Sequence, residues 1–360
     1  MKYIDEFRNK KICMSLAKEI FRIANGRDIT LMEVCGTHTM AIYRYGIKGL
    51  LPSNIRLLSG PGCPVCVTPD AEIDKVIAYA RESDVIITTF GDMMRVPGST
   101  SSLDREKSQG KDIRIVYSPA DALKIARKNP EKTVIFLGIG FETTSPTVAA
   151  SINDAKDRDL DNYFVLCKHK MIPPAIKTLL DCGEILIDGF LLPGHVATIT
   201  GTEVYEFIPE EYGISCVVSG FEPVDILQAI LILVKQIKAG NPGVENQYTR
   251  SVKKKGNQKA KLLLKEVFES VDCEWRGLGI IPESGLRIRD KYSAFDADSI
   301  PVEVEPSRKN RECICGEILR GVKTPLNCSL FARECTPENP IGPCMVSSEG
   351  TCAAYYKYGR

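Results

Sequence analysis

The sequence has almost no excess charge and no long hydrophobic run. Its 47 Lys and Arg balance 46 Asp and Glu over 360 residues, which leaves a formal net charge of +1. Without a basic excess, binding to a nucleic acid or an anionic membrane surface is not favoured. The longest apolar stretch, around residues 226–234, is far shorter than the roughly 20 residues of a membrane span. We therefore expect no nucleic-acid partner and no membrane association.

Targeting and nucleotide-binding signatures are also missing. Residues 1–11 are charged and lack the apolar core of a secretory signal. The glycine pairs within residues 60–62 and 138–140 lack the third glycine of a dinucleotide-binding loop, and no Walker-type Gly-Lys-Ser/Thr is present. These absences favour a cytoplasmic protein and argue against a nucleotide cofactor.

Cysteine is the residue that stands out by its number and distribution. The 14 cysteines make up about 4% of the chain, below the roughly 8–10% of a small disulfide-rich scaffold. In a reducing compartment, cysteines in such numbers more often bind metals or do chemistry than form cross-links. Three lie among glycines and prolines, and six crowd into the last 48 residues: Cys35, Cys63 and Cys66, then Cys313, Cys315, Cys328, Cys335, Cys344 and Cys352.

Short β-branched or apolar segments alternate with helical patterns over the first 240 residues. We expect strands at residues 30–34, 55–59, 85–89, 113–117, 133–137, 163–167, 189–192 and 215–219, with helices between most of them. This alternation predicts parallel βαβ units. Because a strand, a glycine turn and a helix occur in each half, we predict two parallel-sheet, Rossmann-like α/β domains rather than one long sheet.

The domain boundaries follow from these patterns. Residues 1–27 are expected to form an N-terminal helix that packs on the C-terminal region. Residues 28–129 and 130–240 are the two predicted α/β domains. Residues 241–360 begin with a connector and a helix over 259–270, and continue as a loop-rich, cysteine-rich region. So many loops can hardly bury a conventional core, so this region is expected to need a metal to hold its shape.

The first candidate site is Cys35-Gly36-Thr37-His38, directly after the strand at residues 30–34. Ligands and nucleophiles of α/β folds lie at the carboxyl ends of strands. Gly36 permits a sharp turn, and a nearby histidine lowers a thiol pKa or helps to bind a metal. A buried structural cysteine and a hydrogen-bonded loop histidine fit an isolated Cys-x-x-His equally well.

The second candidate site is Gly-Pro-Gly-Cys-Pro-Val-Cys at residues 60–66. The two-residue spacing of Cys63 and Cys66 suits a redox disulfide or the chelation of one metal ion by two thiolates. Because the spacing and the turn residues agree, chemistry is favoured over two structural cysteines.

The third candidate site is formed by four C-terminal cysteines that are separated by seven, nine and eight positions: Cys328, Cys335, Cys344 and Cys352. Four thiolates suit zinc or a [4Fe-4S] cluster, and the spacing alone does not choose between them. The Cys-x-Cys pair of Cys313 and Cys315 offers alternative ligands.

Polar blocks at the ends of predicted strands form a fourth group, at residues 90–95, 140–144, 168–170 and 193–195. With the first candidate site, they contain Asp92 and all three histidines of the chain. Loops at the carboxyl ends of strands carry function in α/β folds, so we expect these blocks to share a cleft.

Together the blocks resemble the HypD family of hydrogenase maturation factors, from about residue 28 to the C-terminus. The matching segments are Cys-Gly-Thr-His-Thr (35–39), Gly-Pro-Gly-Cys-Pro-Val-Cys (60–66), Phe-Gly-Asp-Met-Met-Arg-Val-Pro-Gly (90–98), Gly-Phe-Glu-Thr-Thr-Ser-Pro (140–146), Leu-Pro-Gly-His (192–195) and Cys-Met-Val-Ser-Ser-Glu-Gly-Thr-Cys (344–352). Six unusual blocks in one order make the resemblance specific.

The resemblance implies a scaffold that assembles the Fe(CN)2CO moiety of the [NiFe]-hydrogenase active site. It implies HypC as the partner that shares the iron with Cys35, and HypE as the donor of cyanide, carried as a protein-bound thiocyanate. It also implies a [4Fe-4S] cluster in the C-terminal region. We assign this cluster to the four cysteines of the third candidate site, with Cys313 and Cys315 as competing ligands.

These implications give each candidate residue an expected role. Cys35 is the iron ligand, and His38 is a nearby proton donor or a group that tunes the ligand. Cys63 and Cys66 are a redox relay or additional iron ligands, since a dithiol passes electrons in pairs. Asp92 and Glu349 are polar groups near the iron or the cluster path. The protein is then a redox-active assembly scaffold rather than a classical enzyme.

Two other functions stay open from the residues alone. A stand-alone thiol-disulfide oxidoreductase would use Cys63 and Cys66, but it leaves the C-terminal cysteines unexplained. A zinc-stabilised binding module would have no redox role, because zinc has no redox chemistry.

Overall fold

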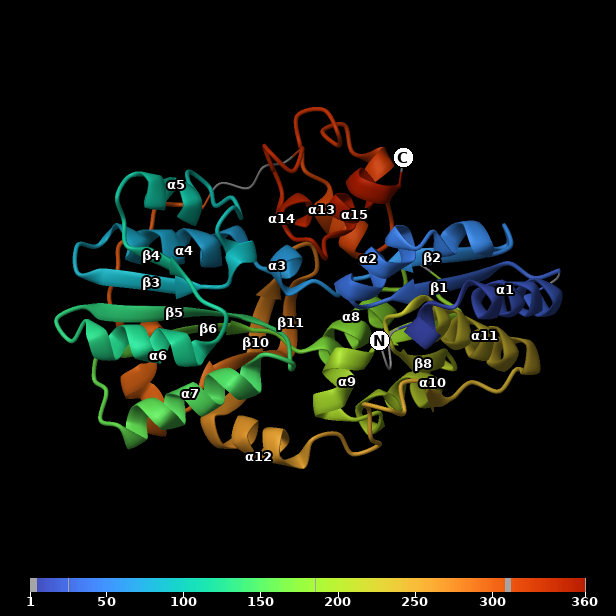
Figure 1. The fold of residues 1–360 in the computed structure, drawn as a ribbon, viewed down its shortest axis with the longest axis horizontal. Helices are drawn as coiled ribbons and strands as arrows, with labels where there is room; N and C mark the ends of the chain where they lie inside the picture. Colours follow the sequence, from blue (N-terminus) through green and yellow to red (C-terminus); the bar gives the residue numbers. More distant parts are fainter. Residues whose placement is uncertain (1–4, 25, 185, 308–311, 360) are drawn as a thin grey trace.

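The computed structural model describes residues 5–24, 26–184, 186–307 and 312–359. These residues form two parallel sheets of five and four strands and one antiparallel hairpin. The sheets lie side by side, and the C-terminal region lies over their junction (Figure 1). The predicted α/β class, with two parallel sheets and a cysteine-rich C-terminal region, is confirmed.

The first sheet has the strand order β2-β1-β7-β8-β9. Its strands are β1 (Ile29–Glu33), β2 (Ile55–Ser59), β7 (Gly189–Pro193), β8 (Ser215–Ser219) and β9 (Val244–Asn246). Two long helices, α1 (Lys10–Ala24) and α11 (Pro223–Ala239), pack on each other beside this sheet. The buried side chains of Ile20, Leu31 and Ile230 join the three elements. The main partner of α1 is therefore α11, and the expected packing of residues 1–27 on residues 241–360 stays a prediction.

The second sheet has the strand order β4-β3-β5-β6. Its strands are β3 (Val85–Thr89), β4 (Ile113–Ile115), β5 (Thr133–Gly140) and β6 (Tyr163–His169). Helices α6 (Pro119–Lys128) and α7 (Ser145–Asp157) lie on one face, and α4 (Asp70–Arg81) lies on the other (Figure 1). Since both faces are covered, β3 and β5 are almost continuously buried, as is usual for parallel sheets.

The sheets do not divide the chain into two consecutive halves. The first sheet takes two strands from residues before the second sheet and three from residues after it. The expectation of one sheet from each half is thus wrong, because the chain crosses to the second sheet and then returns. The boundaries 28–129 and 130–240, taken as folding units, stay a prediction.

An antiparallel hairpin is the main element that the sequence did not predict. Helix α12 (Gln258–Val267) ends three residues before the expected residue 270, and β10 (Phe268–Trp275) follows at once, paired with β11 (Gly279–Ile288). Tertiary pairing here overrides the helical spacing of the apolar residues. The hairpin is anchored to the second sheet, since the Met171 N–H donates to the Ser284 carbonyl at 2.8 Å.

The remaining elements are short. The C-terminal region contains α13 (Cys315–Leu319), α14 (Pro343–Val346) and α15 (Thr351–Tyr358). The other helices are α2 (Gly36–Arg44), α3 (Pro64–Val67), α5 (Leu103–Ser108), α8 (Ile172–Cys182), α9 (Gly194–Thr200) and α10 (Phe207–Tyr212). Helix α15 packs on α2, where the rings of Tyr43 and Tyr355 lie 4.4 Å apart. This contact ties the C-terminal region to the first sheet.

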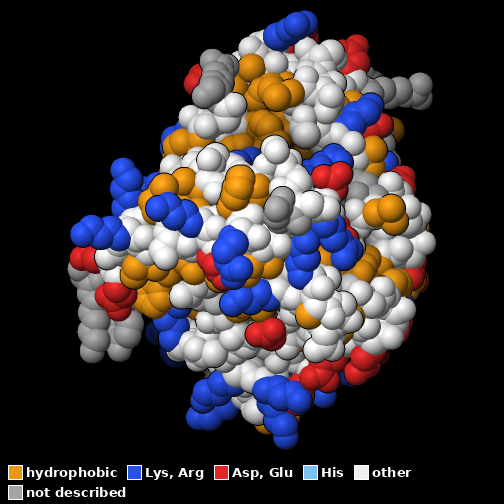
Figure 2. Space-filling view, turned by 90° about the vertical axis from the view of Figure 1, so that its right-hand side faces the viewer, with side chains coloured by type: hydrophobic (Ala, Val, Ile, Leu, Met, Phe, Trp, Pro, Cys, Tyr) orange, Lys and Arg blue, Asp and Glu red, His pale blue; other side chains and the backbone are white. Residues whose placement is uncertain are grey.

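Charges of both signs are interspersed over the face of the molecule that Figure 2 shows, in keeping with the net charge of +1. Among the helices of the described ranges, none combines the length and the apolar character needed to cross a membrane.

Candidate functional site

A cavity of about 310 Å³ lies where the carboxyl ends of strands from both sheets meet the C-terminal region. Its walls come from the blocks after β1, β2, β3, β5 and β7, and from residues just before α15. The polar and sulfur-bearing residues that line it include Cys35, Thr37, Asp92, Thr143, His195 and Glu349. We call it the Cys35 cavity. It confirms the expected placement of most of the polar blocks in one cleft.

Cys35 is held by two interlocked loops. It lies two residues after the end of β1 and is the N-cap residue of α2. The Gly36 N–H donates to the Gly62 carbonyl at 2.9 Å. A Cβ on Gly62 would lie 2.1 Å from the Cys35 nitrogen, so only glycine fits at this approach. The turn of residues 60–66 therefore sets the position of Cys35 through backbone contact.

Glu33, which is not among the residues predicted from the sequence, supports the same loop. Its side chain is buried, and it accepts hydrogen bonds from the Cys35 N–H at 3.0 Å and from the Thr39 hydroxyl. Burial raises the pKa of Glu33 to about 8. A glutamate inside an otherwise apolar strand end, two residues before the candidate cysteine, was the available signal, because a buried carboxyl needs partners.

The Cys35 thiol is nearly enclosed, with 7% of the residue exposed. Burial raises its pKa to about 12, and the negative charge of Glu349 adds to the shift. The thiol is therefore protonated near neutral pH in the free chain. A metal that binds here must displace this proton, as thiolates rather than thiols are ligands.

The C-terminal region closes the Cys35 cavity through hydrogen bonds of Glu349 and Ser347. The Thr37 hydroxyl donates to Glu349, whose Cβ would lie only 2.5 Å from a Cβ on Gly36. Asp92 accepts a 3.4 Å hydrogen bond from the Ser347 hydroxyl. Burial raises the pKa of Glu349. Both predicted carboxylates thus line the same cavity as Cys35. Each is hydrogen-bonded to a hydroxyl about 250 to 310 positions away in the sequence.

The three histidines have different surroundings. His195 lines the Cys35 cavity and stacks on Phe221, with ring centroids 3.8 Å apart. His38 is fully buried behind it: its Nε2 lies 2.9 Å from the Gly220 carbonyl oxygen, and burial lowers its pKa to about 4. His38 is therefore neutral and does not line the cavity. Its expected part in proton donation stays a prediction.

The block at residues 168–170 corrects the expected common cleft. His169 is buried in the second sheet, where its Nδ1 lies 3.6 Å from the Cys167 sulfur. Lys168 pairs with Asp298 at 3.0 Å. These side chains lie away from the Cys35 cavity because β6 continues two residues beyond its predicted end and turns them into other contacts.

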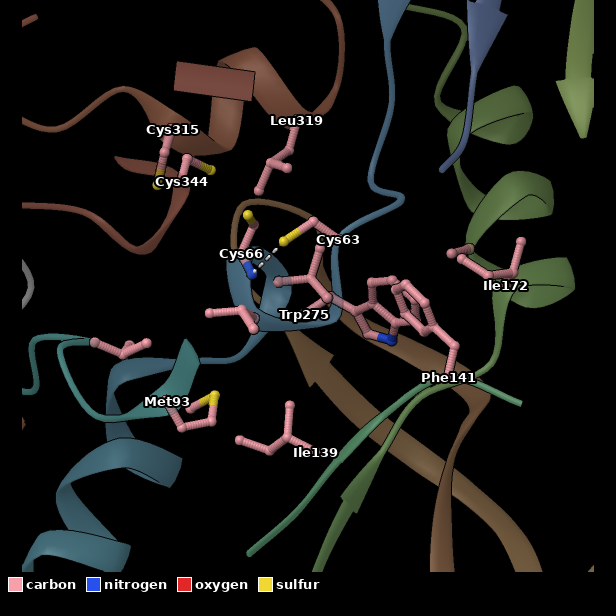
Figure 3. Close-up of a cluster of buried hydrophobic side chains, with 14 of the residues drawn as sticks. Cys63, Cys66, Met93, Ile139, Phe141, Ile172, Trp275, Cys315, Leu319 and Cys344 are labelled. Atoms are coloured by element: carbon pink, nitrogen blue, oxygen red, sulfur yellow. Dashed lines mark hydrogen bonds between the residues drawn. The ribbon is translucent and has the colours of Figure 1, made fainter. Parts of the chain in front are cut away.

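Cys63 is the N-cap residue of the short helix α3, and Cys66 lies on this helix (Figure 3). Both are buried, and the Cys63 sulfur accepts a 3.3 Å hydrogen bond from the Cys66 N–H. Their neighbours Gly62, Pro64 and Val65 line the Cys35 cavity, whereas the two sulfur atoms face other thiols and apolar side chains. The pair therefore lies between the Cys35 cavity and the C-terminal region.

The hairpin of β10 and β11 packs against the segment that carries Cys63 and Cys66. Trp275 is fully buried and stacks on Phe141 with centroids 5.9 Å apart, close to Cys63 and Cys66 (Figure 3). The neighbouring Arg276 N–H donates to the Val67 carbonyl at 2.8 Å, at the end of α3. Because the hairpin was not predicted, its contribution to the site was missed as well.

The six C-terminal cysteines line a second cavity, which we call the thiol cavity. It has only about 10 Å³ of free space. The cysteines are Cys313, Cys315, Cys328, Cys335, Cys344 and Cys352, and apolar side chains such as Leu330, Phe331 and Met345 fill the gaps. All 14 cysteines of the chain are free thiols. The cavity is at the lower limit for one water molecule, so its surroundings are dry.

A row of five thiols joins this cavity to the Cys-x-x-Cys pair. The side chains interact in sequence, since each thiol shifts the pKa of the next, in the order Cys63, Cys66, Cys344, Cys315 and Cys313. Hydrogen bonds from Cys315 and Cys66 lower the pKa of Cys344, whereas burial raises that of Cys66. Figure 3 shows Cys315 and Cys344 directly across from Cys63 and Cys66. Thiols from three separate segments of the chain thus form one continuous path.

The donors of the thiol cavity suit an iron-sulfur cluster in their chemistry. Several cysteines in a dry apolar pocket are the usual ligands and surroundings of such a cluster. No three His, Cys, Asp or Glu side chains in the part of the chain described by the structure are grouped as a ready metal-ion site. The residues present fit a cluster by the chemistry of their donors and by their dry surroundings.

Comparisons with known proteins agree with these blocks. A family model described as "HypD: Hydrogenase formation hypA family" matches residues 11–359. The hydrogenase maturation factor HypD of Cupriavidus necator is 50% identical over 370 aligned positions, which cover 100% of this chain and 98% of that protein. The HypD proteins of Rhizobium leguminosarum bv. viciae and Azotobacter vinelandii are 49% and 48% identical, with 100% of this chain and 96% and 97% of theirs covered.

Proposed function

Because the chain belongs to the HypD family, we propose that it is a hydrogenase maturation factor on which the Fe(CN)2CO moiety of [NiFe]-hydrogenase is assembled with HypC and HypE. The row of thiols from Cys313 to Cys63, which ends beside the Cys35 cavity, is the observation that carries this proposal. It connects a sulfur-rich pocket suited to a redox cofactor with a cavity suited to a metal cargo.

The iron cargo is bound in the Cys35 cavity. Cys35 provides a soft thiolate, which suits a low-valent iron that carries cyanide and carbonyl ligands. HypC provides the second anchor, so the iron is shared between the two proteins. Asp92, His195 and Glu349 surround the cavity with groups that accept or donate hydrogen bonds to bound ligands. Because burial raises the pKa of Cys35, iron binding must release a proton from this thiol.

Cys63 and Cys66 supply the electrons that release cyanide. HypE delivers cyanide as a thiocyanate, whose sulfur–carbon bond must be cleaved reductively. The two thiols lose two protons and two electrons and become a disulfide, while the thiocyanate becomes a thiol and hydrogen cyanide. Deprotonation then gives the cyanide that binds the iron. The position of α3 supports this role, since Pro64 and Val65 line the Cys35 cavity and Cys66 interacts with Cys344 of the thiol cavity.

The oxidised pair is reduced again through Cys344 and Cys315. Cys344 contacts both Cys66 and Cys315, so a thiol–disulfide exchange can move along the row. A [4Fe-4S] cluster in the thiol cavity supplies electrons one at a time when bound.

Four of the six C-terminal cysteines hold the cluster in this proposal. Cys328, Cys335 and Cys352 belong to every set that we consider. Cys344 is the fourth ligand predicted from the sequence, and that set stays a prediction. The contacts of Cys344 with two other thiols favour Cys313 as the fourth ligand instead, because Cys315 and Cys344 are then a second dithiol.

Metal analysis and infrared spectroscopy of anaerobically purified protein, alone and with HypC, test the proposal. We expect about four irons per chain from a cluster, and cyanide and carbonyl bands in the complex. Cys35→Ala is expected to lose these bands and to keep the cluster, while Cys182→Ser, at an exposed thiol, keeps both. Bands that persist in Cys35→Ala would remove Cys35 from its role.

The same samples distinguish the two cluster sets and the two other functions. Cys344→Ser keeps the cluster if Cys313 is the fourth ligand and loses it if Cys344 is. Zinc without iron would support a zinc-stabilised binding module. Turnover of a generic disulfide substrate, without iron in the complex, would support a stand-alone oxidoreductase.

A further inference from the structure

Lys170 has an unusual environment for a lysine. It directly follows β6, and only 1% of its side chain is exposed. Its Nζ lies 2.8 Å from the Glu274 carbonyl oxygen and 3.0 Å from the Cys273 sulfur, but 3.6 Å from the nearest carboxylate oxygen, on Glu72. Lys168, two residues earlier, instead has a carboxylate at 3.0 Å. The side chain closest to the buried Lys170 nitrogen is therefore a thiol.

The backbone around Cys273 directs its sulfur toward Lys170. The register of β10 against β11 shifts between Val271 and Cys273, which marks a bulge. A Cβ on the facing Gly285 would lie 2.6 Å from the Cys273 Cβ and 3.1 Å from its sulfur, so a larger residue would displace the thiol. The backbones of Lys170 and Gly285 pair as an isolated antiparallel β-bridge. Glycine, bulge and bridge together hold the nitrogen and the sulfur in contact.

We propose that Lys170 and Cys273 are a modification site at which dioxygen forms a covalent nitrogen–oxygen–sulfur bridge. One N–H bond and the S–H bond break, and one N–O and one O–S bond form. The second oxygen atom leaves as water, so the amine, the thiol and dioxygen give the bridge and one water. The nitrogen and the sulfur together lose four electrons, which dioxygen accepts.

The surroundings provide what this reaction needs. Cys273 is half-buried, so a small oxidant reaches its sulfur from solvent, whereas the lysine is shielded. The amine must be neutral to react, and Glu72 lies close enough to take its proton. Lys170 also lies over the Trp275 ring at 5.9 Å, which leaves the nitrogen little freedom to move away.

The bridge would fasten the hairpin to the end of β6. The same hairpin carries Trp275, which packs close to Cys63 and Cys66. Oxygen would thus rigidify the support of the Cys-x-x-Cys pair without oxidising that pair. The modification itself does not rest on the proposed function, because it requires only the two side chains and dioxygen.

Peptide mass spectrometry of the full chain, purified without oxygen and then exposed to air, tests the proposal. We expect a cross-linked species that joins the peptides of Lys170 and Cys273, heavier than their sum by one oxygen and lighter by two hydrogens. A thiol reductant should restore the separate peptides. Cys182→Ser, which removes an exposed thiol, should keep the cross-link.

Two variants remove the bridge in different ways. Cys273→Ser leaves the buried lysine in place and should show no cross-link; Lys170→Arg keeps the positive charge and should show none either. Separate peptides in air-exposed wild-type protein would overturn the proposal. So would oxidation of Cys273 to a sulfinic or sulfonic acid alone, or a cross-link of the same mass that persists in Cys273→Ser.

Discussion

The Cys35 cavity and the thiol cavity lie close together but differ in almost every physical property. The first has about 310 Å³ of space and is lined by carboxylates, hydroxyls and a histidine as well as Cys35. The second has about 10 Å³ and is lined by six cysteines and apolar side chains. A polar cavity with space suits a cargo that arrives and leaves. A dry pocket of thiols suits a group that stays.

The two cavities also depend on different kinds of structure. The Cys35 cavity is formed at the ends of buried parallel strands, whose cores hold it in place. The thiol cavity is formed by loops and helices of four to eight residues, which have little core of their own. Short helices are marginal without tertiary contacts. We therefore expect the two sites to be separable by mutation, and the following changes test that difference.

Cys352→Ser is expected to have the largest effect. Cys352 belongs to every ligand set considered for the thiol cavity, so the variant should lose most of the about four irons of a cluster. The C-terminal region should loosen, because a cluster bound there would link its loops to one another. Iron analysis and hydrogen exchange measure the two effects. Rapid exchange that spreads into β1, β3 and β5 would show that the sites are not separable.

Trp275→Ala should destabilise the protein by about 3–5 kcal/mol, the usual cost of removing a large buried aromatic side chain. It also removes the 2.8 Å hydrogen bond from the indole N–H to the Ser284 hydroxyl. Urea denaturation measures the change. Ile280→Ala is the matched control on the same hairpin, since this residue is 73% exposed and should change stability by less than about 0.5 kcal/mol. Equal effects of both variants would contradict the role of Trp275 as a support.

Glu142→Gln tests a buried carboxyl beside the Cys35 cavity. One oxygen accepts a 3.0 Å hydrogen bond from the Ile172 N–H, and among the described residues the other has no partner. Burial raises the pKa of Glu142 from 4.5 to about 7. Ionising this carboxyl therefore costs more free energy in the folded protein than in the unfolded chain. Its contribution to stability is complete below pH 4.5 and is lost as the pH rises through about 7.

The variant should remove this pH dependence. The stability of Glu142→Gln relative to wild type should therefore be greater at pH 8 than at pH 5, by an amount on the order of 1–3 kcal/mol. Urea denaturation at both pH values gives this difference, and other titrating groups cancel in the comparison. The same wild-type-to-variant difference at both pH values would show that Glu142 is ionised throughout.

Glu349→Gln should have the smallest effect on stability, less than about 1 kcal/mol, because the amide oxygen still accepts the hydrogen bond from Thr37. It removes the charge that adds to the raised pKa of Cys35. The Cys35 thiol should then react with an alkylating reagent at a lower pH than in wild type. An unchanged pH profile of alkylation would show that burial alone sets this pKa.

Much of the scaffold was predictable, because each buried strand is a continuous run of β-branched and apolar residues that is visible in the sequence. All eight predicted strands are present, three of them with the predicted bounds, and the main helices lie where the apolar spacing placed them. The hairpin was not predictable in this way. Its strands alternate weakly between buried and exposed residues, and they are stabilised by pairing with each other and by contacts with β6 and α8.

The candidate residues show the same division. Cys35, Asp92 and Glu349 were selected from sequence blocks and do meet in one cavity. His38 came from the same kind of block but does not line the cavity, because its ring is fully buried and its Nε2 faces the Gly220 carbonyl oxygen. Glu33 was not selected, although its carboxylate holds the Cys35 backbone. A sequence block identifies a conspicuous segment, but it does not tell which side chains face the space between segments.

The sequence by itself determined the α/β class, the family and the candidate cysteines, since periodicity, residue type and spacing are local properties of the chain. Only the tertiary structure decided that the chain leaves the first sheet and returns to it, and that Cys63, Cys66, Cys344, Cys315 and Cys313 form one row. The reason is physical. Contacts between residues hundreds of positions apart depend on how whole sheets and loops pack, and no local pattern records that packing.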